Sequence, residues 1–260
     1  MFDTHCHLNF DVFDENLDSV IKESKKVGVD RILVPGTDIG TSKKAIELAS
    51  KHPSLYAAVG IHPTEQIVEE ELPEMLKELE ALVESSDNVL AIGEVGLDHY
   101  KYKSATRVQE AYFIKQAELA AKLGLSLIIH NRQSTETLIE LLEKVWSPAL
   151  EGSTVFHCAE PRDELLYFAK NNGVYLGFDG DITYDEKKQE FVKKVPLELL
   201  VVETDSPFLT PLPIRSTGTK YNEPKNLILI IKKVSELLGK DEEEIMEATT
   251  KNALKLFNLV

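Results

Sequence analysis

The sequence predicts an α/β protein with the architecture of a (β/α)8 barrel that carries extra C-terminal helices. Eight short apolar runs occur along the 260 residues, and segments long enough for helices separate them. Near-continuous apolar strands that alternate with helices are typical of parallel strands buried on both faces. Since α/β barrels of about 250 residues form one domain, we expect residues 1–260 to form a single domain. A doubly wound open sheet is the structural alternative.

The predicted strands are runs rich in Val, Ile, Leu and Ala, and turn residues close several of them. In chain order they cover 2–7, 31–36, 55–59, 89–92, 125–129, 154–156, 174–176 and 199–202. The predicted helices have apolar residues at helical spacing, as at Leu17, Val20 and Ile21 before the stop signal Gly28. They cover 15–27, 41–50, 72–85, 106–123, 135–146, 162–171 and 185–195. Residues 206–222, rich in Pro, predict a long loop over the barrel mouth, and helices near 224–238 and 241–257 end the chain.

Composition and net charge limit the kinds of protein that this chain can be. No run reaches the roughly eighteen uncharged apolar residues that a membrane span needs, and the N-terminus does not have the pattern of a signal peptide. We therefore expect a cytoplasmic protein that does not bind membranes and needs no obligate protein partner. The formal net charge of -15 argues against a broad grip on duplex nucleic acid, but it allows a small local site. Cys6 and Cys158 should be free thiols that point away from the barrel mouth and have no catalytic role.

Metal-competent side chains gather where the predicted strands end. Five of the seven histidines lie at these ends. A single histidine in such a place is more often structural, but independent structural roles would not put so many at one edge of a barrel. The set that we predict to bind metal is His5, His7, Glu94, His130, His157 and Asp205.

Two divalent ions about 3.5 to 4 Å apart need a bridging carboxylate, terminal imidazoles and open positions for water and substrate. Glu94 suits the bridge. His5 and His7, which alternate to one side of a strand, would complete one site with Asp205, while His130 and His157 would complete the other. A metal-bound water would become the nucleophile and Asp205 could act as its base, so Glu94 and Asp205 are the predicted catalytic residues. One to two ions per chain are expected; zinc, manganese and iron suit this set, and magnesium suits it only where oxygen ligands dominate.

Four further residues are candidates for substrate binding. His62 could contact a metal-bound water or a phosphate, or it could simply order its loop. Arg132 suits a phosphate, with a salt bridge to a barrel carboxylate as the alternative. Tyr100 could stack on a base and Lys101 could steer a nucleic-acid backbone, or both could be bystanders.

Two buried acids could hold an imidazole in one tautomer. Asp3 precedes the first histidines, and Glu203 shares the side of Asp205 on the last strand by alternation.

Several motifs carry a resemblance to the TatD family of metal-dependent deoxyribonucleases. In chain order they are His5-Cys6-His7, Gly60-Ile61-His62-Pro63, Gly93-Glu94-Val95-Gly96-Leu97-Asp98, His130-Asn131-Arg132, His157-Cys158, Glu203-Thr204-Asp205-Ser206-Pro207, Asn222-Glu223-Pro224 and Thr250-Lys251-Asn252-Ala253. The resemblance implies an amidohydrolase-like barrel, one to two divalent metals and phosphodiester hydrolysis, often exonucleolytic on DNA. It implies the same six ligands. The chain departs from the usual pattern at Thr64, Asn131, Gln133 and Ala159 and in a longer loop at 215–221, all of which bear on substrate choice.

The leading hypothesis is therefore a metal-dependent hydrolase, a deoxyribonuclease that acts on DNA ends or single strands. A second hypothesis keeps the site but hydrolyses an ester or amide, as an aminoacyl-tRNA deacylase would, because a metal hydroxide also attacks acyl carbon. A third is a binding or regulatory protein with a degenerate site, against which the intact ligand set argues.

Overall fold

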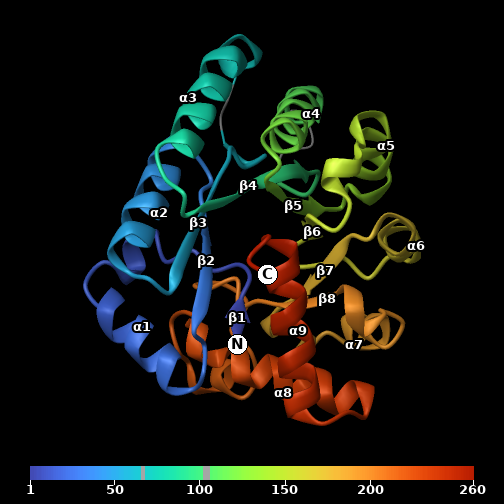
Figure 1. Cartoon of the computed structure of the whole chain (residues 1–260). Coiled ribbons are helices and arrows are strands. Elements are labelled where there is room, and N and C mark those ends of the chain that lie inside the picture. The colour runs from blue at the N-terminus through green and yellow to red at the C-terminus, as the bar shows by residue number, and fades with distance from the viewer. Residues whose placement is uncertain (66–67, 102–105) are drawn as a thin grey trace.

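A computed structural model describes residues 1–65, 68–101 and 106–260. Within these residues, eight strands form one sheet in the order β1 to β8, and each strand is parallel to its neighbours. Their bounds are Phe2–Asp3, Arg31–Pro35, Leu55–Val59, Val89–Asp98, Ser126–Arg132, Thr154–Phe156, Tyr175–Phe178 and Leu200–Val202. The backbone beyond β1 meets the backbone beyond β8 through a parallel bridge between Cys6 and Ser206. The sheet thus forms a nearly closed (β/α)8 barrel, as predicted, and not an open doubly wound sheet (Figure 1).

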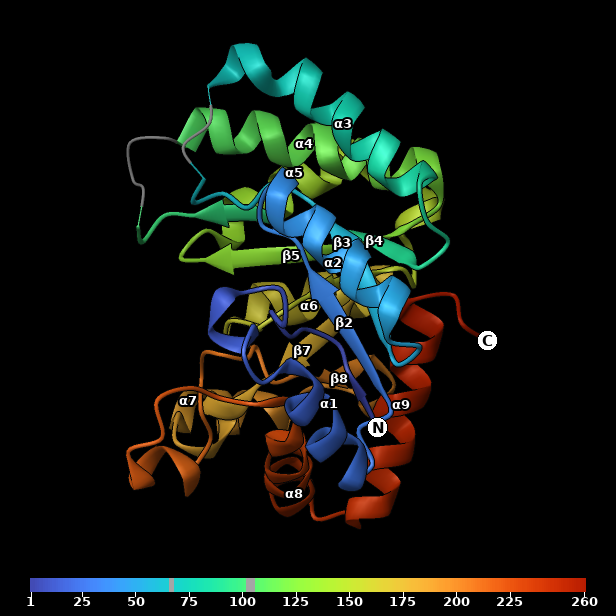
Figure 2. The same cartoon turned by 90° about the vertical axis from the view of Figure 1, so that its left-hand side faces the viewer.

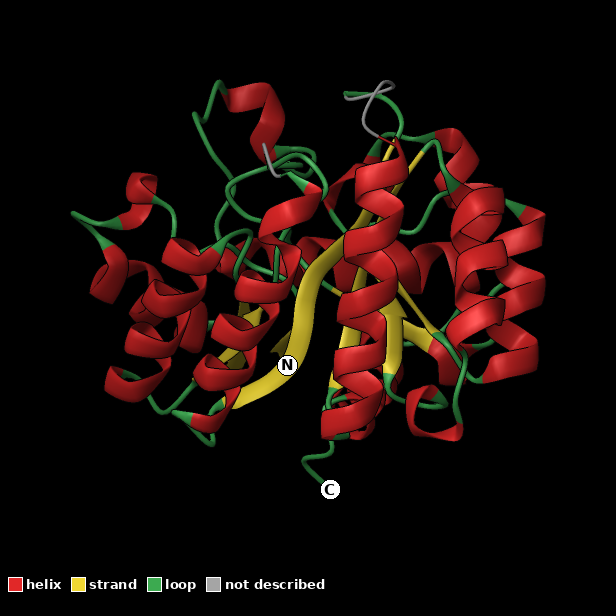
Figure 3. Cartoon of the chain, turned by 90° about the horizontal axis from the view of Figure 1, so that it is seen from above, coloured by secondary structure: helices red, strands yellow, loops and turns green. Residues whose placement is uncertain are grey.

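Helices follow the strands and enclose the barrel (Figure 3). The seven helices α1 to α7 span Leu17–Lys26, Ile39–Lys51, Leu72–Glu84, Thr106–Leu123, Thr135–Val145, Asp163–Asn172 and Glu186–Val192, and the terminal pair α8 and α9 span Leu227–Leu238 and Glu242–Leu256. Local chemistry sets their ends. Asp38 accepts a hydrogen bond from the Thr41 N–H, so α2 begins earlier than predicted. Gly173, with φ +63°, follows α6 and caps its end. No helix in the described part of the chain is long and apolar enough to cross a membrane.

β1 and β4 differ most from the predicted ranges, and β5 ends at Arg132 rather than at residue 129. β1 ends at Asp3, so His5 and His7 lie beyond the strand rather than on it. β4 continues through Glu94 to Asp98, although its apolar run stops at Ile92. Gly96 permits this extension, because a Cβ there would lie 1.9 Å from the carbonyl oxygen of His130. The missing side chain lets β4 and β5 run side by side up to the barrel mouth.

Helix α9 fills one end of the barrel. Ala253, Leu256 and Phe257 pack in one cluster with side chains from the strands, including Phe2 and Ile128. In Figure 2 this helix lies at the end of the barrel opposite the arrowheads of the strands. The other end, where the strands finish, is the one that carries the predicted site.

Candidate active site

A pocket of about 710 Å³ opens at the carboxyl ends of the strands. Five of the six predicted metal ligands line it, namely His7, Glu94, His130, His157 and Asp205. The sixth, His5, lies directly behind them with no exposed surface. The fold therefore brings together all six side chains, although they come from β4, β5 and the segments that follow β1, β6 and β8.

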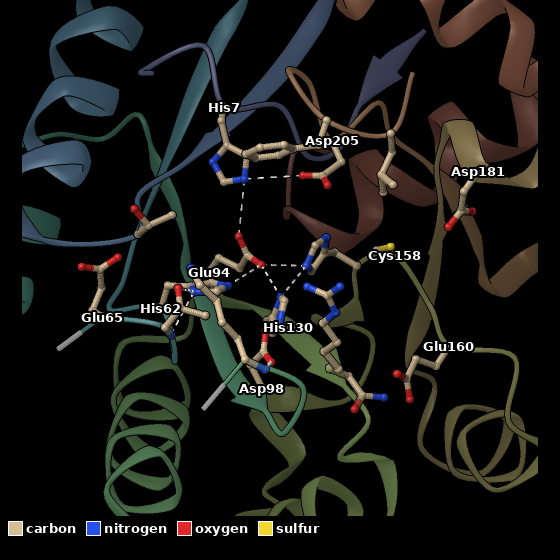
Figure 4. A pocket seen from close by; sticks show the side chains of 18 of the residues that line it. His7, His62, Glu65, Glu94, Asp98, His130, Cys158, Glu160, Asp181 and Asp205 are labelled. Carbon is tan, nitrogen blue, oxygen red and sulfur yellow. Dashed lines mark hydrogen bonds and ion pairs between the residues drawn. The ribbon is translucent and has the colours of Figure 1, made fainter. Parts of the chain in front are cut away.

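Glu94 lies at the centre of this group (Figure 4). Its Oε2 is 3.3 Å from Nε2 of His5 and 3.5 Å from Nε2 of His7. Its Oε1 is 2.8 Å from Nδ1 of His130 and 2.7 Å from Nε2 of His157. The two carboxylate oxygens thus face different predicted ligands, His5 and His7 on one side and His130 and His157 on the other. This is the arrangement expected of a carboxylate between two cations.

Asp205 stands on the side of the first pair. Its Oδ1 is 3.7 Å from Nε2 of His5 and 3.5 Å from Nε2 of His7. Its backbone has φ +48°, a conformation that few non-glycine residues adopt outside special sites, and its N–H donates to the carbonyl of His5. This turn aims the carboxylate into the pocket immediately after β8.

The electrostatics of the cluster suit a cation. Burial raises the pKa of the Glu94 carboxyl, but the surrounding imidazoles, His157 foremost, hold this pKa well below its ordinary value. Burial and the charge of His157 lower the pKa of His5 to about 4. A buried anion and a neutral imidazole are the protonation states that metal ligands require. The donor set of imidazole nitrogens and carboxylate oxygens thus fits a divalent cation.

Asp98 follows the bridging glutamate in the sequence, and no role is predicted for it. In the structure its carboxylate contacts His130. Its Oδ2 is 3.3 Å from Nε2 of His130, on the ring edge away from Glu94. Burial lowers the pKa of His130, but hydrogen bonds with Asp98 and Glu94 raise it to about 9, so a cation that binds this imidazole would displace its proton. A carboxylate behind a histidine fixes the tautomer and orientation of a metal ligand.

The predicted tautomer role of Asp3 is wrong. Its carboxylate accepts hydrogen bonds from the N–H and hydroxyl of Thr204, at 2.9 and 2.6 Å, and from the N–H of His5 at 3.4 Å. Asp3 therefore ties the end of β1 to the loop after β8, and it orders backbone rather than an imidazole.

Glu203 holds the backbone next to His157. Its Oε1 accepts a hydrogen bond of 2.6 Å from the N–H of Cys158 and lies 3.7 Å from Nδ1 of His157. Cys158 has φ +47°, which breaks the alternation assumed from the sequence. The predicted direction of Cys158 is therefore wrong, because this cysteine lines the pocket; both cysteines are free thiols, as expected.

No sequence pattern points to Lys188, on α7. Its ammonium lies 2.7 Å from Asp181, 3.5 Å from Asp179 and 3.2 Å from Sγ of Cys158. Burial lowers the pKa of this lysine, but the charges around it raise the pKa well above its ordinary value. Cys158, Asp179 and Asp181 could otherwise hold a metal ion, but the ammonium is already placed among them.

The four predicted substrate-binding residues have different surroundings. His62 points at the cluster, with Nε2 3.2 Å from Oε1 of Glu94, and also orders its own loop through Thr64. Lys101 and Arg132 line the pocket. The guanidinium of Arg132 lies over the ring of Tyr100, 4.1 Å from its centroid, so this face of Tyr100 is covered.

Substituting Gly177 tests whether Glu203 positions His157. A Cβ at this glycine of β7 would lie 2.6 Å from the Glu203 carboxylate, which must then shift away from the N–H of Cys158. We expect Gly177→Ala to weaken metal affinity about 10- to 100-fold, the usual cost of disturbing a group behind a metal ligand. Titration calorimetry with manganese measures this affinity. Gly40→Ala on α2 is the control, because Gly40, like Gly177, does not have positive φ, and a Cβ there would come no closer than 3.4 Å to the nearest atom. Equal affinities in the two variants would refute the role given to Glu203.

Comparison with known proteins agrees with this geometry. The sequence matches the family described as TatD related DNase over residues 2–258. It is 38% identical to the uncharacterized metal-dependent hydrolase YabD of Bacillus subtilis, over all of this chain and 99% of that protein. It is 35% identical to the 3'-5' ssDNA/RNA exonuclease TatD of Erwinia tasmaniensis, over the full length of both. The fold matches the crystal structure of the TatD homologue YJJV from Escherichia coli with a TM-score of 0.90 and 28% identity, covering 99% of this chain and 98% of that one. The chain therefore belongs to the TatD-related DNase family, and it is a metal-dependent hydrolase of the nuclease class.

Proposed function

We propose that the chain is a deoxyribonuclease that removes nucleotides from the ends of single-stranded DNA. The observation that carries this proposal is the position of Glu94, whose two oxygens face two separate pairs of predicted metal ligands. Relatives support the choice of substrate, since one is named a 3'-5' ssDNA/RNA exonuclease and a human one, 30% identical, is named deoxyribonuclease TATDN3.

Six side chains would hold one or two divalent cations. His5, His7 and Asp205 would hold one, His130 and His157 the other, and Glu94 would contact both. When bound, such cations acidify a water molecule and neutralise charge on the phosphate. Zinc, manganese and iron are the ions that this imidazole-rich set favours.

The chain's own residues would supply orientation and proton transfer. Asp205, aimed into the pocket by its left-handed backbone, would take the proton of the attacking water and pass it to the leaving oxygen. Arg132 and Lys101 line the same pocket and would bind phosphate oxygens of the strand. His62, which faces Glu94, would contact the scissile phosphate from the side of β3.

The pocket and the charge of the chain favour a strand end over duplex DNA. A volume of about 710 Å³ matches one small ligand, such as a single nucleotide. The net charge of -15 disfavours wide contact with the backbone of a duplex. The free thiols and this kind of substrate are in keeping with a cytoplasmic enzyme.

Digestion of single-stranded DNA tests the proposal. Metal-stripped protein is incubated with an oligonucleotide labelled at its 5' or its 3' end, and magnesium, manganese or zinc is restored separately. We expect a metal-dependent ladder that shortens from one end, and at least a hundredfold slower cleavage by Asp205→Ala, since a general base contributes about 10²- to 10⁴-fold. Cleavage of an aminoacyl ester on tRNA without cleavage of DNA would replace this proposal with the deacylase, and absence of metal binding would favour a binding protein.

A further inference from the structure

The wall of the pocket next to Asp205 carries an exposed aromatic ring. Phe208 lines the pocket three residues after Asp205, and 51% of its surface is exposed. Exposing a large apolar ring costs free energy unless a ligand or partner covers it. Here the ring lies beside the proposed metal ligands, so the substrate is the ligand in a position to cover it.

Phe208 belongs to a small aromatic group. Phe10, which also lines the pocket, stacks on the His7 ring with centroids 4.5 Å apart and an interplanar angle of 18°. The Phe208 ring stands edge-on to both, 6.1 Å from the centroid of each. The two phenylalanines therefore form a wall that begins at a predicted metal ligand and runs outward to solvent.

The loop that carries Phe208 is held by hydrogen bonds. The N–H of Phe208 donates to the carbonyl of Asp205, and the N–H of Asn222 donates to the carbonyl of Pro207. The side chain of Asn222, fully buried, donates to the carbonyl of Thr204 at 2.9 Å. The ring is thus presented in place before any ligand arrives, which reduces the entropy cost of binding.

The opposite wall has a different chemistry. Arg132 is the last residue of β5, and in an eight-stranded barrel β5 lies across from β1, next to which the Phe208 loop emerges. The pocket therefore has cationic groups on one side, the carboxylate and imidazole cluster at its base, and an aromatic face on the other side. A nucleotide has the same division, with a charged phosphate and a flat base at opposite ends.

We infer that Phe208, supported by Phe10, is the stacking platform for the nucleobase that flanks the scissile phosphodiester. The inference rests on the proposed function and specifies how that site holds its substrate. A phenyl face recognises the π-face of a base and not its edge, so the platform accepts all four bases. Among the described residues, Tyr100 is another exposed aromatic near the site, but Arg132 already covers one of its faces.

Oligonucleotides that lack one base test the platform. Single strands are prepared with a normal base or an abasic tetrahydrofuran at the terminal position, and a second pair carries the same change at the penultimate position. Stacking on an aromatic side chain favours a base by about 5- to 150-fold in affinity. We expect the wild-type protein to show a ratio of kcat/KM, base over abasic, in this range at one of the two positions, and Phe208→Ala to bring that ratio close to one. Phe208→Tyr should keep the wild-type ratio of kcat/KM, base over abasic.

A second measurement does not need turnover. A terminal 2-aminopurine, whose fluorescence is quenched by stacking, is titrated with metal-stripped protein and should be quenched by the wild type but not by Phe208→Ala. Tyr167→Ala is the matched control, because Tyr167 is also an exposed aromatic, at 71%, and lies on α6 away from the pocket residues. This variant should behave as wild type in both experiments.

The outcomes separate the two proposals. If the wild type cleaves DNA but Phe208→Ala keeps the wild-type ratio, the platform is refuted and the nuclease proposal stands. If the wild type cleaves no DNA with any metal, both fall. A ratio near one in the wild type at both positions also refutes the platform.

Discussion

Glu94→Gln lowers kcat by about a thousandfold or more. The carboxylate faces five imidazoles with two oxygens, and an amide replaces one of these oxygens by a nitrogen that donates hydrogen bonds and does not bind cations. Loss of several kcal/mol of charge stabilisation, at about 1.4 kcal/mol for each factor of ten, gives this magnitude. Initial rates on single-stranded DNA with manganese measure it, and metal content of the purified variant shows whether binding is lost as well.

The matched control is Glu65→Gln, the same chemical change at a residue that also lines the pocket. Its rate should stay within a few fold of wild type. Circular dichroism establishes that Glu94→Gln keeps the barrel. Full activity in Glu94→Gln would refute both the bridging role of Glu94 and the two-cation arrangement.

Lys188→Met lowers the free energy of unfolding by about 3 to 5 kcal/mol, the usual cost of removing one partner from a buried ion pair. The ammonium lies against Asp181 and Asp179, and Asp179 has no exposed surface. Without the lysine these carboxylates are left close together and unpaired. Urea denaturation at pH 7 measures the loss.

Two comparisons isolate the cause. Lys187→Met, at the exposed neighbouring position on α7, should change stability by less than about 0.5 kcal/mol. The deficit of Lys188→Met should shrink as the pH falls, because unpaired buried carboxylates have raised pKa values and lose their charge by protonation. A deficit that does not depend on pH would assign the loss to packing rather than to charge.

The spacing of apolar residues along the chain predicts most of the barrel, because buried parallel strands and amphipathic helices each have a distinct pattern of apolar residues. The range 55–59 for β3 and 106–123 for α4 agree with the structure residue by residue. β4 was predicted too short because its second half contains Gly93, Glu94 and Gly96, which interrupt an apolar run. The strand resumes after Gly93 and Glu94 only because β5 approaches closely enough to pair with Val95–Asp98, and that approach is a tertiary property.

The proximity of the six predicted ligands also follows from sequence, since the ends of parallel strands in a barrel meet at one mouth. Lys188 could not be found in this way. It follows another lysine on a short helix, and nothing in that pattern shows which of the two is buried. Cys158 was misplaced because alternation holds within a strand, whereas a left-handed residue directly after His157 turns the side chain into the pocket.

Helix α9 closes the end of the barrel opposite the active site. Because its apolar residues close the far end of the barrel, a DNA strand has no route through the protein. Under the proposed function, substrate would enter and product would leave by the same mouth, so each released nucleotide would have to clear the entrance before the strand could advance. Product release through this mouth would then limit the rate of successive cleavage.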